Sequence, residues 1–318
     1  MSQAKEFVGK ILAIAIEPTY FDLERYRLDP KEVVAMAARC HANALRVGMF
    51  SHQGHAYYPS AIAPHAPGLG GRDLLKEFQD ACRETGVALV VYMNSKWDTQ
   101  RYFEHPDWAM RYGEKVRPHE LEAALHIYPM CPNSPYLDYF ASLLREVAGR
   151  YGPSALYIDN FGVSMDCLCR FCADAFQEAT GKERPAKSDW NDPVWQELRR
   201  WSRERNFVLA RRLVEAIRSV RPETVVVFNR GGFRTLTGHG NPEDIYEFAH
   251  SIADNVHGES AVRFYGQSFA HINEQCAFAR AIETPMWTWV EYPLLPWSHV
   301  SAPPSEVKLK AAKVLANS

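Results

Sequence analysis

Short runs of β-branched and apolar residues alternate with longer segments of helical periodicity along most of the chain. The short runs predict strands at 11–16, 44–50, 87–93, 155–159, 224–229, a weaker one ending near 259, and 285–291. The longer segments predict helices at 29–38, 72–86, 137–151, 207–220, 244–251, 269–282 and 304–317. This alternation is typical of parallel βα units.

The number of strands bears on how the sheet closes. Seven strands with a helix after the last predict an α/β fold of the TIM (β/α)8 barrel type, with the eighth strand missing from this chain. Either the chain is a fragment, or residues 125–129 supply a strand, and we favour the fragment. We therefore expect one catalytic barrel domain over 1–318, truncated at its C-terminus. Unpaired edges on such a barrel favour a homo-oligomer.

Two long polar segments interrupt the alternation, at 97–129 and 182–192, and both read as loops. Loops of this length in a compact domain are more often functional than idle.

Hydrogen-bonding and aromatic side chains follow the carboxyl ends of the predicted strands, where barrel enzymes carry their chemistry. Sugar hydroxyls need directional hydrogen-bond partners, and sugar C–H faces stack on aromatic rings. The sequence therefore predicts a carbohydrate substrate. The expected contacts are Glu17, His52, His55, Tyr58, Asn94, Asn229, Arg230 and Trp289. The carboxylates at these ends that could carry out catalysis are Asp159, Glu259 and Glu291.

Composition narrows the class of protein further. The chain has 318 residues, 47% of them hydrophobic, so it can bury a large core. A formal charge of -2 gives no electrostatic case for nucleic acid or an anionic membrane. We see no apolar signal-peptide region at the amino terminus and no run of membrane-spanning length. Seven cysteines fit a reducing compartment better than a disulfide framework, so we expect a cytoplasmic protein.

Three of the cysteines form a dense cluster, Cys167-x-Cys169-x-x-Cys172, directly after the fourth predicted strand. Thiols at this spacing usually hold a metal, and we favour zinc over redox-active thiols and over a disulfide. Cys40, Cys82 and Cys276 lie in helical patterns and are most simply small core residues.

Four motifs follow one another along residues 30–165, which are Gly54-His-Ala-Tyr-Tyr-Pro59, Arg72-Asp-Leu-Leu75, Cys131-Pro-Asn-Ser-Pro-Tyr136 and Leu156-Tyr-Ile-Asp159-Asn160. In these motifs and in their order, the segment resembles the hypothetical glycosyl hydrolase family 6, a family of TIM-barrel glycoside hydrolases. The resemblance implies a glycosidase of the O-glycosyl hydrolase type.

The first two motifs also resemble α-L-fucosidases, in which an aspartate on strand four is the nucleophile. This resemblance implies Asp159 as nucleophile and Glu259 as acid/base. Glycoside hydrolysis normally needs two carboxyl groups. Glu291 and then Glu17 are the next choices for the second group, and retention or inversion stays open. Asp159 could instead cap a turn, and His52 and His55 could be structural.

The cysteine cluster resembles that of zinc-carrying β-galactosidases, in which one upstream cysteine joins a C-x-C-x-x-C run. This implies Cys131 as the fourth ligand beside Cys167, Cys169 and Cys172. Four thiolates leave tetrahedral zinc no open position, so the implied zinc is structural, and we expect no organic cofactor. Those galactosidases carry their acid/base glutamate after an Asp-Asn pair. Phe161 stands there in this chain, so their catalytic assignment does not transfer.

Three functions follow from these patterns. The leading one is a glycoside hydrolase that cleaves a terminal sugar, as a fucosidase or galactosidase does. The second is a catalytically inactive carbohydrate-binding barrel. The third is a zinc-dependent hydrolase with the metal in its active site, which the all-sulfur ligand set disfavours.

Overall fold

The computed structural model describes residues 12–16, 28–113, 127–229, 242–259, 268–284, 286–288 and 302–317. The chain divides into two compact units, Ile11–Thr224 and the combination of Met1–Lys10 with Val225–Ser318. Within each unit, the strands lie side by side in the order in which they occur in the sequence.

The larger unit is built on four parallel strands, which are β1 (Ala13–Ile16), β2 (Ala44–Phe50), β3 (Ala88–Asn94) and β4 (Ala155–Asp159). Neighbouring strands pair in the order β1-β2-β3-β4, and Asn94 at the end of β3 lies opposite Asp159 at the end of β4. Every residue of β2 is buried, as are all but the first of β3. Burial on both faces explains why these two runs are mostly apolar. Arg46 of β2 is the charged exception, and its guanidinium lies over the rings of Tyr92 and Tyr157. All four strand predictions are confirmed.

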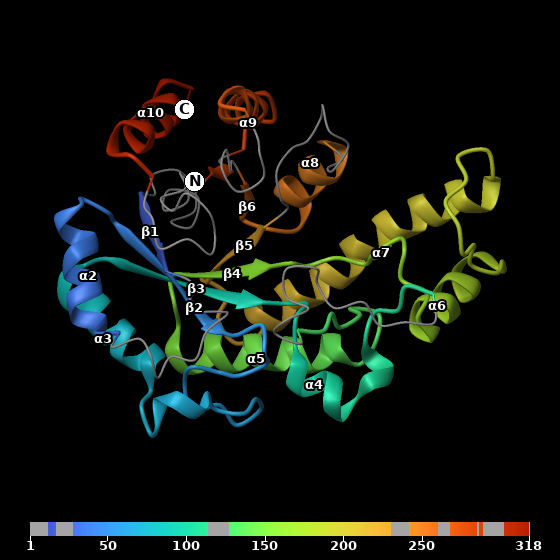
Figure 1. Ribbon diagram of the computed structural model, residues 1–318, viewed down its shortest axis with the longest axis horizontal. Helices are drawn as coiled ribbons and strands as arrows, with labels where there is room; N and C mark the ends of the chain where they lie inside the picture. The colour runs from blue at the N-terminus through green and yellow to red at the C-terminus, as the bar shows by residue number, and fades with distance from the viewer. Residues whose placement is uncertain are drawn as a thin grey trace. The chain divides into compact units, whose positions relative to one another are not determined.

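Six α-helices lie among the described residues of this unit (Figure 1). They are α2 (Pro30–Arg39), α3 (Leu74–Thr85), α4 (Thr99–Glu104), α5 (Tyr136–Tyr151), α6 (Arg170–Thr180) and α7 (Pro193–Arg218). Two short 3-10 turns, Pro67–Leu69 and Pro106–Trp108, precede α3 and follow α4. Helix α2 packs against α3, and α5 packs against α7.

Two of these helices, α4 and α6, were not predicted from the sequence. Helix α7 begins at Pro193, whereas the sequence pattern predicts its start at residue 207. Asp192 caps α7, since its side chain accepts a hydrogen bond from the Val194 N–H at 2.8 Å. Proline in the first turn has no N–H to leave unpaired there. The Asp192-Pro193 pair therefore starts a helix directly after the predicted loop 182–192.

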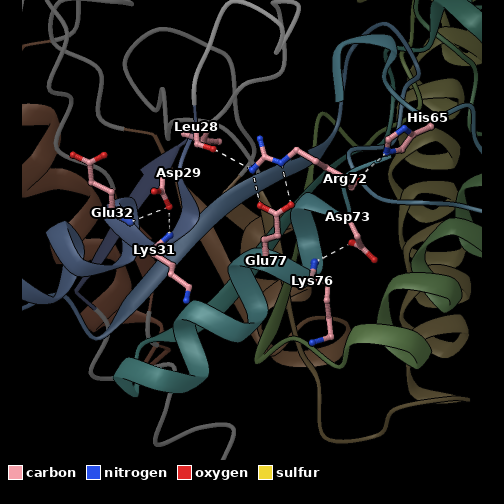
Figure 2. Close-up of polar contacts among 9 residues, drawn as sticks. All are labelled: Leu28, Asp29, Lys31, Glu32, His65, Arg72, Asp73, Lys76 and Glu77. Carbon is pink, nitrogen blue, oxygen red and sulfur yellow. Dashed lines mark hydrogen bonds and ion pairs between the residues drawn. The ribbon is translucent and has the colours of Figure 1, made fainter. Parts of the chain in front are cut away.

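Figure 2 shows how the starts of α2 and α3 are secured. Asp29 accepts a hydrogen bond from the Lys31 N–H at 2.9 Å, and Asp73 accepts one from Lys76 at the same distance. Between these caps, the Arg72 guanidinium binds both carboxylate oxygens of Glu77 on α3, at 3.0 and 2.5 Å. The same guanidinium reaches the carbonyl of Leu28, ahead of α2, at 3.3 Å. The Arg72-Asp-Leu-Leu75 motif therefore ties two helix starts together.

The smaller unit repeats the pattern with three parallel strands, β5 (Val225–Asn229), β6 (Asn255–Gly258) and β7 (Met286–Thr288). They pair in the order β5-β6-β7. Its described helices are α8 (Pro242–Ser251), α9 (Ala270–Ala281) and α10 (Pro304–Asn317). Helix α8 packs against β6, and α9 packs against β7 and α10. These elements confirm the predicted alternation.

The described part of the chain thus contains seven strands, as the sequence predicts for a TIM-type α/β fold without its eighth strand. Residues 127–130 do not supply that strand, because they form isolated antiparallel bridges. Pro129 pairs with Trp97, and Met130 pairs with Ala109, both in the segment after β3. Across the described residues, the helices are all too short or too polar to cross a membrane.

Candidate active site

Asp159 ends β4 and is half-buried. Its carboxylate oxygen Oδ2 accepts hydrogen bonds from the Tyr92 hydroxyl and from the Asn160 side-chain amide, the latter at 2.8 Å. Its backbone carbonyl accepts two more from Ser95, one from the N–H at 3.0 Å and one from the hydroxyl at 2.6 Å. Donated hydrogen bonds therefore hold both the backbone and the carboxylate of Asp159 in place.

Asn160 makes this arrangement possible through its backbone. Its φ of 57° lies in the left-handed region, which asparagine enters more readily than most other residues. The turn ends β4 and folds the Asn160 amide back onto the preceding carboxylate. Unusual backbone at the carboxyl end of a strand is common at functional sites.

Tyr92 extends the network to His52. Both side chains are 2% exposed, and His52 Nε2 lies 3.3 Å from the Tyr92 hydroxyl oxygen. An ionised carboxylate can only accept hydrogen bonds, so the single hydroxyl proton of Tyr92 is directed to Asp159. The Tyr92 oxygen then accepts from His52 Nε2. His52 was predicted from the sequence, whereas Tyr92, the residue that connects it to Asp159, was not.

The other predicted contacts in this unit have different surroundings. Asn94 is fully buried, and its amide donates to the Trp97 carbonyl at 2.5 Å and accepts from the Trp97 N–H at 3.1 Å. Tyr58 is fully buried and packs edge-to-face on Tyr151, where α5 ends, with ring centroids 5.5 Å apart. His55 is half-buried in the loop after β2. The structure therefore connects His52, but neither Asn94 nor Tyr58, to Asp159 through these contacts.

Asp98 packs directly against the loop that contains His52 and His55. Gly54 of that loop has φ 91°, and a Cβ there would lie only 2.0 Å from Asp98 Oδ1. Asp98 is fully buried and caps α4 by accepting a hydrogen bond from the Arg101 N–H at 2.8 Å. Burial raises the pKa of the Asp98 carboxyl from 3.8 to about 7.

This pKa predicts a pH-dependent stability. Between about pH 4 and pH 7, Asp98 is protonated in the folded protein and ionised in the unfolded chain, so the folded state binds more protons. The free energy of unfolding should therefore fall as the pH rises through this window, by at most about 1.4 kcal/mol per unit. We expect Asp98→Asn, which keeps an acceptor for the Arg101 N–H, to remove this fall. Urea unfolding of both proteins at several pH values measures it, and equal slopes would contradict the assignment.

In the smaller unit, Glu259 follows β6 and is half-buried. Its Oε1 accepts a hydrogen bond at 2.6 Å from the side-chain amide of Asn229, at the end of β5. Its backbone carbonyl accepts one at 2.7 Å from Gln275 on α9. Two residues predicted from the sequence, Asn229 and Glu259, are thus brought together, whereas Gln275 was not foreseen. The remaining predicted residues, Glu17, Arg230, Trp289 and Glu291, lie outside the described residues.

The four cysteines singled out in the sequence converge in the larger unit. The Sγ atoms of Cys131, Cys167, Cys169 and Cys172 all lie within 4.8 Å of one another, and all four residues are buried. Tetrahedral zinc with Zn–S bonds of about 2.3 Å places its ligands about 3.8 Å apart, which this spacing allows. The group therefore fits a metal ion and joins the segment between β3 and α5 to the start of α6.

Neighbouring polar groups support the cluster. The Asn133 amide donates to the Cys172 sulfur at 3.4 Å, and Arg205 of α7 holds the Asn133 oxygen at 2.7 Å. The three neighbouring thiols, together with burial, raise the pKa of the Cys131 thiol. A bound cation offsets such an effect because it stabilises thiolates directly.

The solved structures that resemble this fold include an α-L-fucosidase, β-galactosidases and a glycoside hydrolase domain. The chain is similar to an α-L-fucosidase isoenzyme 2 from Paenibacillus thiaminolyticus, with 20% identity and a TM-score of 0.59 over 96% of this chain. A polyextremophilic β-galactosidase from Halorubrum lacusprofundi matches 97% of it, with 18% identity and a TM-score of 0.70. The chain spans about half the length of these two proteins, 48% and 51%.

The PgaB (BpsB) glycoside hydrolase domain from Bordetella bronchiseptica matches over most of both chains, 96% of this one and 91% of that one. Its identity is 11% and its TM-score 0.73. In sequence, residues 29–160 match the model of the family described as Hypothetical glycosyl hydrolase 6. This confirms the resemblance expected from the motifs, and the matched stretch ends just after Asp159. A search of curated proteins by sequence gives no match.

Proposed function

We propose that this protein is a glycoside hydrolase that cleaves a terminal sugar, with Asp159 as nucleophile and Glu259 as general acid/base. The proposal is carried by the Asp159 carboxylate, which hydrogen bonds hold at the carboxyl end of a buried parallel strand. The match of residues 29–160 to a glycosyl hydrolase family supports it.

The proposed reaction proceeds in two steps. The Asp159 carboxylate attacks the anomeric carbon while Glu259 protonates the departing glycosidic oxygen, which leaves a glycosyl ester on Asp159. Glu259 then takes a proton from water, the water oxygen attacks the anomeric carbon, and the Asp159 ester bond breaks. Because the anomeric carbon is attacked twice, this scheme retains the configuration of the sugar.

The surrounding residues have supporting roles in this scheme. Tyr92 and Asn160 hold the Asp159 carboxylate, and Asn229 orients the Glu259 carboxylate. We keep His52, His55, Arg230 and Trp289 as proposed sugar contacts, and Glu291 and Glu17 as alternatives to Glu259. Because the amide of Asn94 shapes a turn and Tyr58 packs on Tyr151, we assign these two to support of the site.

Tyr92→Phe tests the support of the nucleophile. The substitution removes a hydrogen bond to a charged group, worth about 1.5 to 3 kcal/mol, while it keeps the ring that stacks on Tyr157. We expect kcat/KM to fall about 10- to 150-fold, and the melting temperature to fall by several degrees because the same hydrogen bond also stabilises the fold. Tyr112→Phe, in which the lost hydroxyl contacts Met110 instead, serves as the control. An unchanged kcat/KM in Tyr92→Phe would show that the Tyr92 hydroxyl does not support the Asp159 carboxylate in catalysis.

We also propose that the cysteine cluster binds a structural zinc ion. All four candidate ligands are sulfur and buried, which fits a closed site rather than a catalytic one with an open position. This ligand set disfavours a zinc-dependent hydrolase with the metal in its active site.

An organic cofactor has no role in the proposed reaction. The cytoplasm and a homo-oligomeric state stay predictions from the sequence.

A further inference from the structure

One buried side chain on α9 holds the ends of two strands in the smaller unit. Gln275 is 2% exposed. Its amide nitrogen donates to the backbone carbonyl of Glu259, directly after β6, at 2.7 Å. Its amide oxygen accepts from the hydroxyl of Thr288, at the end of β7, at 2.9 Å. Gly258 and Thr288 form the last residue pair between β6 and β7. The Gln275 amide therefore links the two strands just beyond this pair, through the Glu259 carbonyl and the Thr288 hydroxyl.

Chemistry fixes the orientation of this amide. A backbone carbonyl only accepts hydrogen bonds, so the NH2 group of Gln275 must face Glu259. The same nitrogen lies 3.0 Å from His271 Nε2, one turn earlier on α9. His271 Nδ1 in turn lies 3.3 Å from Glu274 Oε2. An Nδ1–H tautomer of His271 satisfies both contacts, since it donates to Glu274 and accepts the second proton of the Gln275 amide.

The strand leaves room for this side chain at Gly258. A Cβ at that position would lie 3.1 Å from the Gln275 amide oxygen and 3.1 Å from the Met286 Cε. Both contacts are tighter than ordinary van der Waals packing, so a side chain at position 258 would displace the amide or β7. Gly258 thus lets a helix side chain approach the strand end directly beside Glu259.

We propose that Gln275 is a positioning residue for the acid/base carboxylate of Glu259, anchored in turn by Thr288 and His271. The inference rests on the proposed role of Glu259. Asn229 holds the carboxylate of Glu259, and Gln275 holds its backbone, so the two together restrict where the acid proton is delivered. A general acid misplaced by about 1 Å can lose on the order of 100-fold in rate.

The leaving group distinguishes positioning of the acid from general support of the fold. A phenyl glycoside needs a proton on its leaving oxygen, whereas a 2,4-dinitrophenyl glycoside departs without one. We would measure kcat/KM for both, as fucosides and galactosides first, in the full chain and in Gln275→Met, which keeps the side-chain length and removes the donor. We expect a loss of roughly 10- to 100-fold on the phenyl glycoside. The loss on the dinitrophenyl glycoside should be less than about threefold, since acid assistance of 10²- to 10⁴-fold is not needed there.

Three further variants make every outcome decisive. Glu259→Gln should show the same selectivity more strongly, and if it does not, the proposed role of Glu259 fails. If Glu259→Gln is selective while Gln275→Met loses both activities equally or neither, the inference about Gln275 alone is overturned. Cys276→Ala, a buried neighbour on α9, controls for helix packing and should leave both rates unchanged. If Gln275→Met does not fold, Thr288→Val decides, because it removes the hydroxyl that anchors the Gln275 amide oxygen and leaves the Gln275 side chain intact.

Discussion

Asp159→Asn should abolish hydrolysis of aryl glycosides while the protein still folds. The amide has nearly the shape of the carboxylate but cannot attack the anomeric carbon, so we expect kcat to fall by at least about 10⁴-fold. The Asp159 backbone contacts with Ser95 do not involve the carboxylate and should persist. The measurement is turnover of a panel of aryl glycosides, with fucosides and galactosides first.

The control for this substitution is Asp166→Asn, an exposed aspartate in the loop after β4. It should keep full activity. Sugar binding that survives in Asp159→Asn, combined with no hydrolysis by the parent protein, would favour the carbohydrate-binding barrel. Turnover by Asp159→Asn above about one hundredth of the parent rate would exclude Asp159 as the nucleophile.

Loss of the proposed zinc site should have the second large effect, on stability. Cys131→Ala removes one of the four buried thiols that we propose as zinc ligands, which come from separate segments of the larger unit. Structural zinc contributes many kcal/mol of folding free energy in small domains, so a loss of several kcal/mol is expected here. The melting temperature should fall by about 10 °C or more, and zinc content measured by mass spectrometry should fall with it.

Cys82→Ala provides the matched control, since Cys82 is equally buried but lies on α3 outside the cluster. It should keep its zinc and lose only the stability that a small cavity costs. Activity assayed well below the melting temperature separates structural from catalytic metal. If chelation removes activity from protein that is still folded, and zinc restores it, the metal is catalytic and our assignment is wrong.

Much of the fold could be predicted because strands that are buried on both faces have a high proportion of apolar residues in sequence. The runs 44–50 and 155–159 are mostly apolar, with Arg46 and the terminal Asp159 as the charged exceptions, and they coincide with β2 and β4. The missed helices are more polar. Helix α7 begins with Pro193 and carries many charged residues before residue 207, so its first half lacks a clear apolar periodicity. The Asp192 cap was the one sequence signal that marked its start.

Candidate site residues could be named from the sequence only where residue type and position together indicate a function. Asp159 at a strand end and the closely spaced cysteines are of this kind, and the structure brings the four thiols together. Tyr92 and Gln275 looked like ordinary strand and helix residues. Their roles depend on contacts across 67 and 16 residues of sequence, which no local pattern encodes.

The central claim, that Asp159 is the nucleophile of a glycosidase, is tested most directly by trapping the covalent intermediate. A 2-deoxy-2-fluoro glycosyl fluoride of the sugar that the parent cleaves slows breakdown of the glycosyl-enzyme, so the sugar stays attached. We predict one added sugar by intact-protein mass spectrometry, mapped to the peptide that contains Asp159 and absent in Asp159→Asn. A sugar attached to another carboxylate, such as Glu291, or turnover by inversion without any attached sugar, would contradict the account.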